Sequence, residues 1–258
     1  MNFASITLPL FASIAWVAIP LGCSKKPAPQ VSLPSIPKRA LKDPSSLAFD
    51  GEKFYIADWT SAGLFELGPS GPRFLRAPTP AQNSSRFIQA LAIGAGRLIV
   101  ETDEGKIFLL DTAEESKFPL ELHPDINRKP GSLICWDGMY VWLTDNGQAH
   151  ATSLLPSGEL AGHPSLARAL AGSSGESGSA LSFACGWEAS HVLVKEKEDY
   201  AIISQSRGRE PKKYIWREQD LIPLAIAATG KNTLAALCRR RGREGSFEII
   251  AWTPKGAV

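Results

Sequence analysis

The sequence is poor in the residues and motifs that mark catalytic and metal sites. Its 258 residues include four cysteines, four histidines and two methionines, and no cysteine has the CxxC or Cys/His spacing of a zinc site. The GxSxG, HExxH, P-loop and GxGxxG motifs are also absent. The formal net charge of +2 is too small to indicate nucleic-acid binding, which needs a concentrated basic face. These absences argue against zinc enzymes, nucleotide-binding proteins and nucleic-acid-binding proteins.

An internal repeat is present. With 44% hydrophobic and 21% charged residues, the chain has the composition of a folded globular protein. A short apolar motif with a central leucine recurs at residues 46–49, 90–93, 132–135, 180–183 and 223–226. Spacings of 42 to 48 residues between these leucines are typical of four-stranded propeller blades.

Each copy of the motif is followed by further short strands. Glycines such as Gly51 and Gly96 stand where a hairpin turn needs a positive φ, and second and third apolar runs follow. Within the motif large and small residues alternate, as the crowded inner strand of a propeller requires. We therefore predict an all-β fold, a β-propeller of five four-stranded blades spanning residues 45–258, with six blades as the alternative.

The two ends of the repeat region give two further predictions. The last repeat stops after its third strand, so we expect residues 31–36 to supply its outer strand and close the ring. Between the third and fourth repeats, residues 164–171 are predicted to form a short helix, and the Gly- and Ser-rich residues 172–179 a flexible loop.

The first repeat resembles a known type of propeller. Residues 45–58 combine an inner strand, the turn Asp50-Gly51 and a second strand that ends in Ala57-Asp58. This pattern resembles the repeats of NHL and YVTN-type bacterial propellers, and Asp103 and Asp145 end the second strands of the next two repeats in the same way. The resemblance implies a fold and no particular activity.

The N-terminus resembles a bacterial lipoprotein signal. Residues 3–22 are uncharged and mostly apolar, and Cys23 follows a small residue. The resemblance implies that residues 1–22 are a signal peptide, that Cys23 is lipidated, and that the Pro-rich residues 23–44 form a tether. It also implies a cell-envelope location, periplasmic or on the cell surface. In the alternative, the apolar run is retained as a membrane span, followed by Lys25 and Lys26.

Two cysteines are predicted to lie on inner strands of adjacent blades. An oxidising periplasm would permit a disulfide between Cys135 and Cys185. We favour the alternative, in which both are buried free thiols that act as small hydrophobic residues.

Acidic residues at the ends of second strands are candidate metal ligands. Because these turns lie at one face of a propeller, Asp58, Asp103 and Asp145 could offer oxygen ligands to a divalent cation such as calcium. Turn chemistry alone also selects aspartate at such positions, and we favour that explanation. No other cofactor is expected.

Candidate binding residues are basic or aromatic. The densest charge in the chain is formed by Arg239, Arg240, Arg241 and Arg243, which could hold lipid phosphates, an acidic glycan or an acidic protein surface. Trp59 follows a second strand and could contact a sugar or a peptide. A solvated hairpin is the alternative for the arginines.

These observations favour a membrane-tethered, non-enzymatic binding or scaffold module, whose partner is an envelope protein or a glycan. A metal-dependent propeller hydrolase or lactonase-like enzyme that uses the acidic turns is one alternative. An extracytoplasmic sensor is the other.

Overall fold

The described part of the protein is built from β-strands alone. The computed structural model describes residues 33–257 except 38–39, 61–62, 77–85, 95, 114–119, 123–129, 132, 137–140, 146–147, 153–177, 187–188, 207–208, 231–232 and 254–255. In these ranges there is no helix, and so none with the length and apolar character needed to span a membrane. The predicted signal, the tether up to residue 32 and the predicted helix at 164–171 lie outside the described residues.

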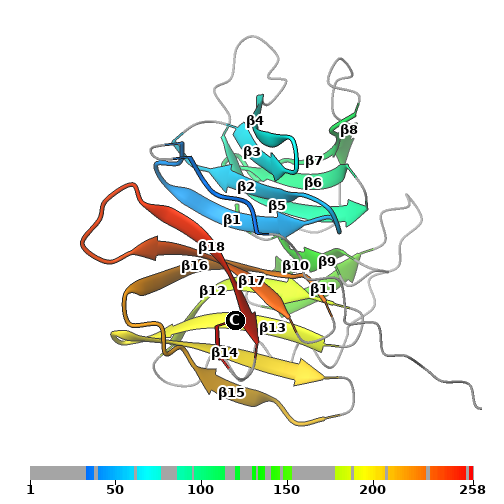
Figure 1. Cartoon of the computed structure of the whole chain (residues 1–258). Coiled ribbons are helices and arrows are strands. Elements are labelled where there is room, and N and C mark those ends of the chain that lie inside the picture. The colour runs from blue at the N-terminus through cyan, green and yellow to red at the C-terminus, as the bar shows by residue number, and fades with distance from the viewer. Residues whose placement is uncertain are drawn as a thin grey trace, which may run out of the picture. The chain divides into compact units, whose positions relative to one another are not determined.

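The strands form five antiparallel sheets in chain order (Figure 1). The first sheet has the order β1 (Pro44–Phe49), β2 (Phe54–Asp58), β3 (Gly63–Gly68), β4 (Gly71–Arg76). The second has β5 (Phe87–Gly94), β6 (Arg97–Thr102), β7 (Ile107–Asp111), β8 (Leu120–Leu122). The third has three described strands, β9 (Leu133–Trp136), β10 (Val141–Asp145), β11 (Gln148–Thr152). The fourth has β12 (Gly178–Cys185), β13 (Ala189–Glu196), β14 (Asp199–Ser206), β15 (Lys212–Ile215), and the fifth has β16 (Leu221–Ala228), β17 (Leu234–Arg240), β18 (Phe247–Thr253), β19 (Gly256–Ala257).

The first strands of the sheets meet one another. In turn, β1 contacts β5, β5 contacts β9, β9 contacts β12, β12 contacts β16, and β16 contacts β1. Sheets of sequential antiparallel strands whose first strands meet in this way form a β-propeller. The all-β propeller prediction is therefore confirmed, with four sheets of four strands among the described residues.

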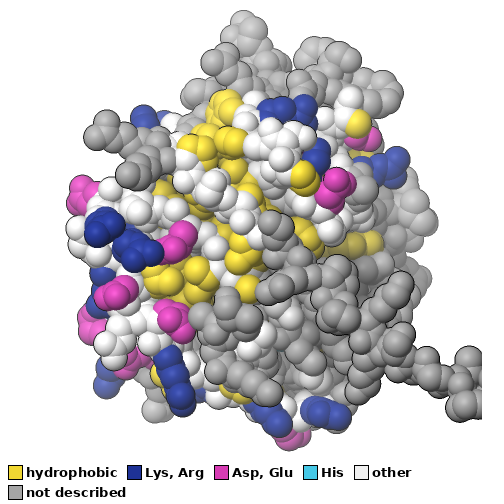
Figure 2. All heavy atoms as spheres, viewed as in Figure 1, with side chains coloured by type: hydrophobic (Ala, Val, Ile, Leu, Met, Phe, Trp, Pro, Cys, Tyr) yellow, Lys and Arg dark blue, Asp and Glu magenta, His cyan; other side chains and the backbone are white. Residues whose placement is uncertain are grey.

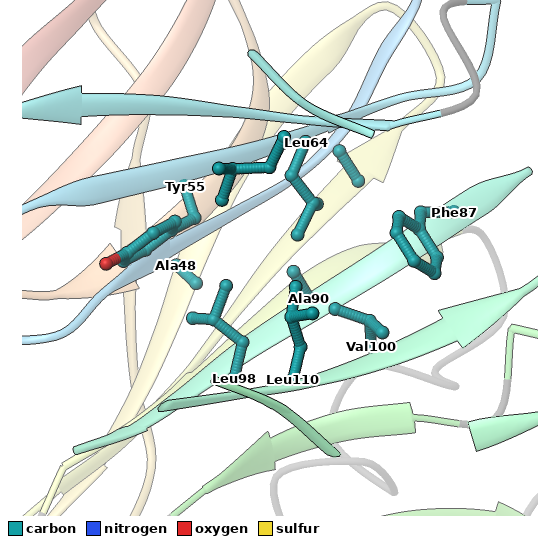
Figure 3. Packing of buried hydrophobic residues seen from close by; sticks show 10 residues of the cluster. Ala48, Tyr55, Leu64, Phe87, Ala90, Leu98, Val100 and Leu110 are labelled. Atoms are coloured by element: carbon teal, nitrogen blue, oxygen red, sulfur yellow. The ribbon is translucent and has the colours of Figure 1, made fainter. Parts of the chain in front are cut away.

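Apolar side chains fill the space between neighbouring sheets. Figure 3 shows Ala48, Tyr55 and Leu64 of the first sheet directed towards Leu98 and Val100 of the second. Tyr55, Leu64, Leu98 and Val100 are all fully buried. Removing such a side chain from water stabilises the fold by about 1.5–3 kcal/mol. The blades therefore hold together mainly through these facing apolar surfaces.

The first hairpin turn is fixed by Asp50. Its Oδ1 accepts hydrogen bonds from the backbone N–H groups of Glu52 and Lys53 at 2.9 and 2.7 Å, and Gly51 has a φ of 105°. Its Oδ2 accepts from the Tyr55 hydroxyl at 2.9 Å and from the Gly96 N–H of the second sheet at 3.1 Å. Burial acts to raise the pKa of Asp50, but these hydrogen bonds outweigh it and the pKa is lowered. The turn is thus bound both to its own sheet and to the next.

Every first strand contains a residue without a partner in the second strand, and β5 contains a second one, Ile93. The register shifts leave unpaired Ser45, Ile88, Ile134, Leu181 and Leu224. These positions recur at nearly constant spacing, so each sheet carries an equivalent β-bulge. Leu181 and Leu224 are the bulged residues themselves, whereas Leu47 is paired with Ile56. The sequence repeat is therefore real, but its leucines do not occupy equivalent positions.

The residue after the bulge contacts the next sheet. Ser46 Oγ accepts a hydrogen bond from the Ala90 N–H, and Ser182 Oγ accepts one from the Ile226 N–H, both at 3.1 Å. In the third sheet this position is Cys135, which forms a disulfide with Cys185 of the fourth. The expectation of two free thiols was therefore wrong, although both cysteines do lie on first strands of adjacent sheets. Cys238 is buried and free.

The closure prediction was also wrong. Residues 33–37 form no strand, and the fourth strand of the last sheet is β19, which pairs Gly256 with Thr253 and Ala257 with Trp252 of β18. The last sheet is thus built from consecutive chain, with its outer strand supplied by the C-terminus.

Candidate functional site

Asp58 holds the segment that leads into the first sheet. It ends β2 and is fully buried. Its Oδ2 accepts hydrogen bonds from the backbone N–H groups of Lys42 at 2.7 Å and Asp43 at 3.0 Å, and its Oδ1 accepts from the Thr60 N–H at 3.1 Å. Both oxygens of this carboxylate are therefore used to fix backbone.

Asp103 occupies a similar place in the second sheet. Its Oδ1 accepts a hydrogen bond from the Arg86 N–H at 2.9 Å, and its own N–H donates to the Arg86 carbonyl at the same distance. Arg86 directly precedes β5, so this carboxylate too lies beside the segment that enters the first strand of its own sheet.

A third carboxylate, Glu101, was missed in the sequence. It lies on β6 and is fully buried. Its Oε1 accepts from the Gly131 N–H at 3.2 Å and its Oε2 from the Leu133 N–H at 3.1 Å, which joins the second sheet to the start of the third. The one available signal was an acidic residue directly after the apolar run of residues 98–100 in this strand.

Trp59 lies between two of these segments. The guanidinium carbon of Arg86 lies 5.9 Å from the centroid of the Trp59 ring, and the backbone N–H of Trp59 donates to the backbone carbonyl of Asp43 at 2.9 Å. The Trp59 side chain is 39% exposed. Asp43, Trp59, Arg86 and Asp103 are thus linked to one another in series, and we call these four residues the Trp59 cluster.

The four arginines of the β17–β18 hairpin differ in their surroundings. Arg239, Arg241 and Arg243 are exposed, whereas Arg240 is half-buried and donates to Glu248 Oε1 at 2.8 Å. In the region of this hairpin, Figure 2 shows Lys and Arg atoms beside Asp and Glu atoms. Within the described part of the chain, the hydrogen bonds of these arginines do not reach the Trp59 cluster. The binding residues predicted from the sequence therefore fall into two separate groups.

The described residues hold only part of the ligand set that the sequence predicts for a metal. No group of three or more His, Cys, Asp or Glu side chains in the described ranges could hold a metal ion. Asp145 ends β10, and its side chain is not among those described. Cys23 lies in the part of the chain that is not described.

The fold and this cluster define a β-propeller with an aromatic and charged group at the end of its first two sheets. No family model and no curated protein matches the sequence. Among solved structures, the PQQ-bound aldose sugar dehydrogenase from Streptomyces coelicolor matches at a TM-score of 0.53 and 12% identity, covering 87% of this chain and 99% of that one. The GH43 endo-arabinanase from Bacillus licheniformis matches at a TM-score of 0.51 and 11% identity, with the same coverage. Virginiamycin B lyase from Staphylococcus aureus matches at a TM-score of 0.39 and 12% identity over 84% of this chain and 87% of that one.

These similarities correct one expectation from the sequence. The expected non-enzymatic binding or scaffold module is contradicted, because the two reported structures with a TM-score above 0.5, each matched over 87% of this chain, are a sugar dehydrogenase and an endo-arabinanase. At 11 to 12% identity the likeness itself shows the fold. The missing catalytic motifs do not argue against an enzyme of this fold, because a propeller site is assembled from loops far apart in the sequence.

Proposed function

We propose that this protein is a propeller hydrolase that acts on a glycan bound at the Trp59 cluster. The observation that carries the proposal is the exposed Trp59 ring, with the Arg86 guanidinium 5.9 Å from its centroid and with Asp43 and Asp103 hydrogen-bonded to the backbone of Trp59 and Arg86. The names of the two matches with a TM-score above 0.5, a sugar dehydrogenase and an endo-arabinanase, support a sugar as substrate. An exposed tryptophan offers a flat apolar surface on which a sugar ring can stack.

Each member of the cluster has a role in this proposal. Trp59 stacks against a sugar ring, and Arg86 attracts the electron-rich oxygens of the substrate. Asp43 and Asp103 act as the carboxylate pair, in which one protonates the leaving glycosidic oxygen and the other takes a proton from the attacking water. The glycosidic C–O bond breaks and a new C–O bond to water forms, so the products are a sugar with a free reducing end and an alcohol.

The proposed reaction does not use a metal. Asp58, the buried member of the predicted ligand set, accepts backbone N–H groups on both of its oxygens. A cation at Asp58 would have to displace these hydrogen bonds, which are stronger to a charged acceptor than to a neutral one. The donor set at Asp58 therefore does not suit a metal, and a calcium site that includes Asp145 stays a prediction.

The proposal is tested by the release of reducing ends from arabinan, xylan and other polysaccharides. For Trp59→Ala we expect KM to rise about 3- to 10-fold, since an aromatic stacking contact contributes about 0.5–1.5 kcal/mol. Asp43→Asn and Asp103→Asn should each lower kcat by about 100-fold or more, as the loss of a general acid or base does.

The matched controls are exposed residues on another sheet. Ile215 is 54% exposed on β15, and Asp199 is exposed at the start of β14, so Ile215→Ala and Asp199→Asn should leave the rate unchanged. All variants should keep the thermal midpoint of the parent protein to within a few degrees. Glycan hydrolysis that is absent, or that is equally fast in the Trp59 and Asp103 variants, would contradict the proposal.

We also propose the finer architecture and the location predicted from the sequence. The third sheet, with its three described strands, completes a five-bladed, NHL-like propeller. Its first strand contacts the first strands of the second and fourth sheets, which supports this count. The Cys135–Cys185 disulfide supports an oxidising compartment, in keeping with a signal at residues 1–22, a lipidated Cys23, a tether to residue 44 and anchoring in the cell envelope. Incorporation of radiolabelled palmitate that is lost in Cys23→Ala would test the lipid anchor.

A further inference from the structure

One backbone contact recurs at the same end of three sheets. In each, the residue directly after the second strand donates its backbone N–H to the carbonyl of the residue directly before the first strand. The three pairs, each joined at 2.9 Å, are Trp59 with Asp43, Asp103 with Arg86, and Arg241 with Asp220. We call these six residues the sheet-end row. Arg241 and Asp220 therefore hold in the fifth sheet the place that the residues of the Trp59 cluster hold in the first two.

The three pairs belong to neighbouring sheets. β16 of the fifth sheet contacts β1 of the first, and β1 contacts β5 of the second. Equivalent strand ends of successive sheets lie at one face of a propeller, so the sheet-end row crosses the fifth, first and second sheets in that order. Facing sheets pack about 10 Å apart, and the row therefore extends over about 20 Å. A ligand that touches all three pairs must be longer than one sugar unit.

Two arginines of the fifth sheet lie on the side that faces the first. Ala236 and Cys238 of β17 pack against the fourth sheet. Side chains alternate along a strand, so Arg239 lies on the opposite side, towards the first sheet. Arg241 continues this alternation, because its N–H extends the pairing of β17 to the residue before β16. Both arginines therefore lie on the side of the fifth sheet that is nearer to the Trp59 cluster.

The arginines of the β17–β18 hairpin, which extends outward from its sheet (Figure 1), differ in whether their charge is paired. Arg240 donates to Glu248 Oε1 at 2.8 Å. Among the described residues, three exposed arginines have side chains without an ion pair or hydrogen bond: Arg239, Arg241 and Arg243. At the tip of the hairpin, the exposed Glu244 offsets the charge of its neighbour Arg243. Two guanidinium groups that face the first sheet are therefore left to meet an anionic ligand, and their fork of N–H donors suits such a group.

Other acidic residues near the hairpin lie mostly on its opposite side. Glu248 is paired in register with Cys238 and so faces the fourth sheet. Glu218 lies near the same thiol, because burial raises the pKa of Cys238 and the charges of Glu248 and Glu218 raise it further. On the side that faces the first sheet, Asp220 accompanies the two arginines, and the exposed Lys42 directly precedes the first pair of the row. Positive charge is therefore in excess on this side.

We propose, on the basis of the hydrolase function proposed above, that the substrate is an extended polysaccharide of anionic sugar units bound along the sheet-end row. Arg239 and Arg241 bind the carboxylate or sulfate group of one unit, and Trp59 stacks against a unit further along the chain. The bond to be cleaved then lies beside Asp43 and Asp103. A neutral glycan would leave the two guanidinium groups without an anionic partner.

Isothermal titration calorimetry of the full chain tests binding apart from cleavage. Polygalacturonate is compared with its methyl ester, which has the same sugar chain without the charges, and dextran sulfate is compared with dextran. We expect a charged polymer to bind at least about 10-fold more tightly than its neutral counterpart, and more tightly per sugar unit than monomeric galacturonate. A preference confined to dextran sulfate would identify the anionic group as a sulfate. Equal affinity for charged and neutral polymers, or for polymer and monomer, would overturn the inference.

Release of reducing ends from the same polymers separates this inference from the hydrolase proposal. Cleavage of polygalacturonate or dextran sulfate would support both. Cleavage of arabinan or xylan without any preference for a charged polymer would keep the hydrolase function and overturn the inference. Tight binding of a charged polymer without cleavage of any polysaccharide would overturn the hydrolase function and keep the row as an anionic-glycan site. A higher affinity for single-stranded DNA than for either charged polysaccharide would assign the row to nucleic acid and would likewise overturn the inference.

Paired substitutions test the two arginines. Arg239→Gln combined with Arg241→Gln should weaken the binding of the charged polymer at least about 10-fold and leave the binding of its neutral counterpart unchanged. The matched control is Arg97→Gln combined with Arg209→Gln, since both are exposed arginines at the opposite end of their sheets. An equal loss of binding in the two double variants would show a general attraction to positive charge and would overturn the assigned role of the row.

Discussion

Reduction of the Cys135–Cys185 disulfide should substantially destabilise the propeller. The bond joins β9 of the third sheet to β12 of the fourth and closes a loop with a sequence separation of 50 residues. In the chain-entropy description, a cross-link of this length stabilises the folded state by about 4 kcal/mol, because it restricts the unfolded chain. With a urea dependence of about 3 kcal/mol per molar for a chain of this size, the unfolding midpoint should fall by about 1.3 M on reduction.

The assay is urea unfolding followed by tryptophan fluorescence, with and without a reductant. Cys135→Ser should unfold at the midpoint of the reduced protein and should not respond to the reductant. Cys238 is buried and free, so Cys238→Ser is the control that must keep the response. Alkylation of the denatured, unreduced protein should leave Cys135 and Cys185 unmodified. The reasoning is refuted if both are alkylated, or if the midpoint is the same with and without the reductant.

Two further predictions concern a buried histidine and a strained turn. His191 is buried, and its Nδ1 lies 2.8 Å from the Ser204 hydroxyl. Burial lowers the pKa of His191 from 6.5 to about 4. Between pH 6.5 and about 4, the unfolded chain therefore binds a proton at His191 that the folded chain does not. Stability should therefore fall by about 3 kcal/mol over this range, and the fall should be smaller in His191→Asn when unfolding is measured at each pH. Lys197 has a φ of 56° in the turn between β13 and β14. This conformation costs a residue with a side chain about 1 kcal/mol, whereas glycine adopts it at little cost. Lys197→Gly should therefore raise the midpoint of thermal unfolding. Glu198→Gly is the matched control and should lower the midpoint of thermal unfolding. A lower midpoint in Lys197→Gly as well would show that the turn is not strained.

The repeat could be read from the sequence because a propeller buries the same kind of strand again and again. The number of copies of the apolar motif equals the number of sheets in the described structure. Turn residues such as Gly51 and Gly96 indicate where the short second and third strands begin and end. The exact register could not be read. A β-bulge adds one residue without changing the apolar character of the strand, so Leu181 looked equivalent to Leu47 although one is unpaired and the other is paired with Ile56.

Features that depend on pairing between distant segments left little signal. β19 has two residues, too few to show any alternation, and it forms because Gly256 and Ala257 can pair with the end of β18. The Cys135–Cys185 disulfide could not be predicted, because the spacing of two cysteines in the sequence does not show whether their sulfur atoms meet. The contact between Trp59 and Arg86 joins residues of different sheets, so neither residue indicates the other in the sequence.

The junction between the fifth and first sheets differs from the others in how it is held. At the first, third and fourth junctions the residue after the bulge makes a polar or covalent bond to the next sheet, through Ser46, Cys135 and Ser182. At the last junction the same position is Ala225, which is fully buried and has no polar side-chain atom. Apolar packing therefore takes the place of that bond where the two ends of the propeller meet, and β19 is also the shortest of the described outer strands.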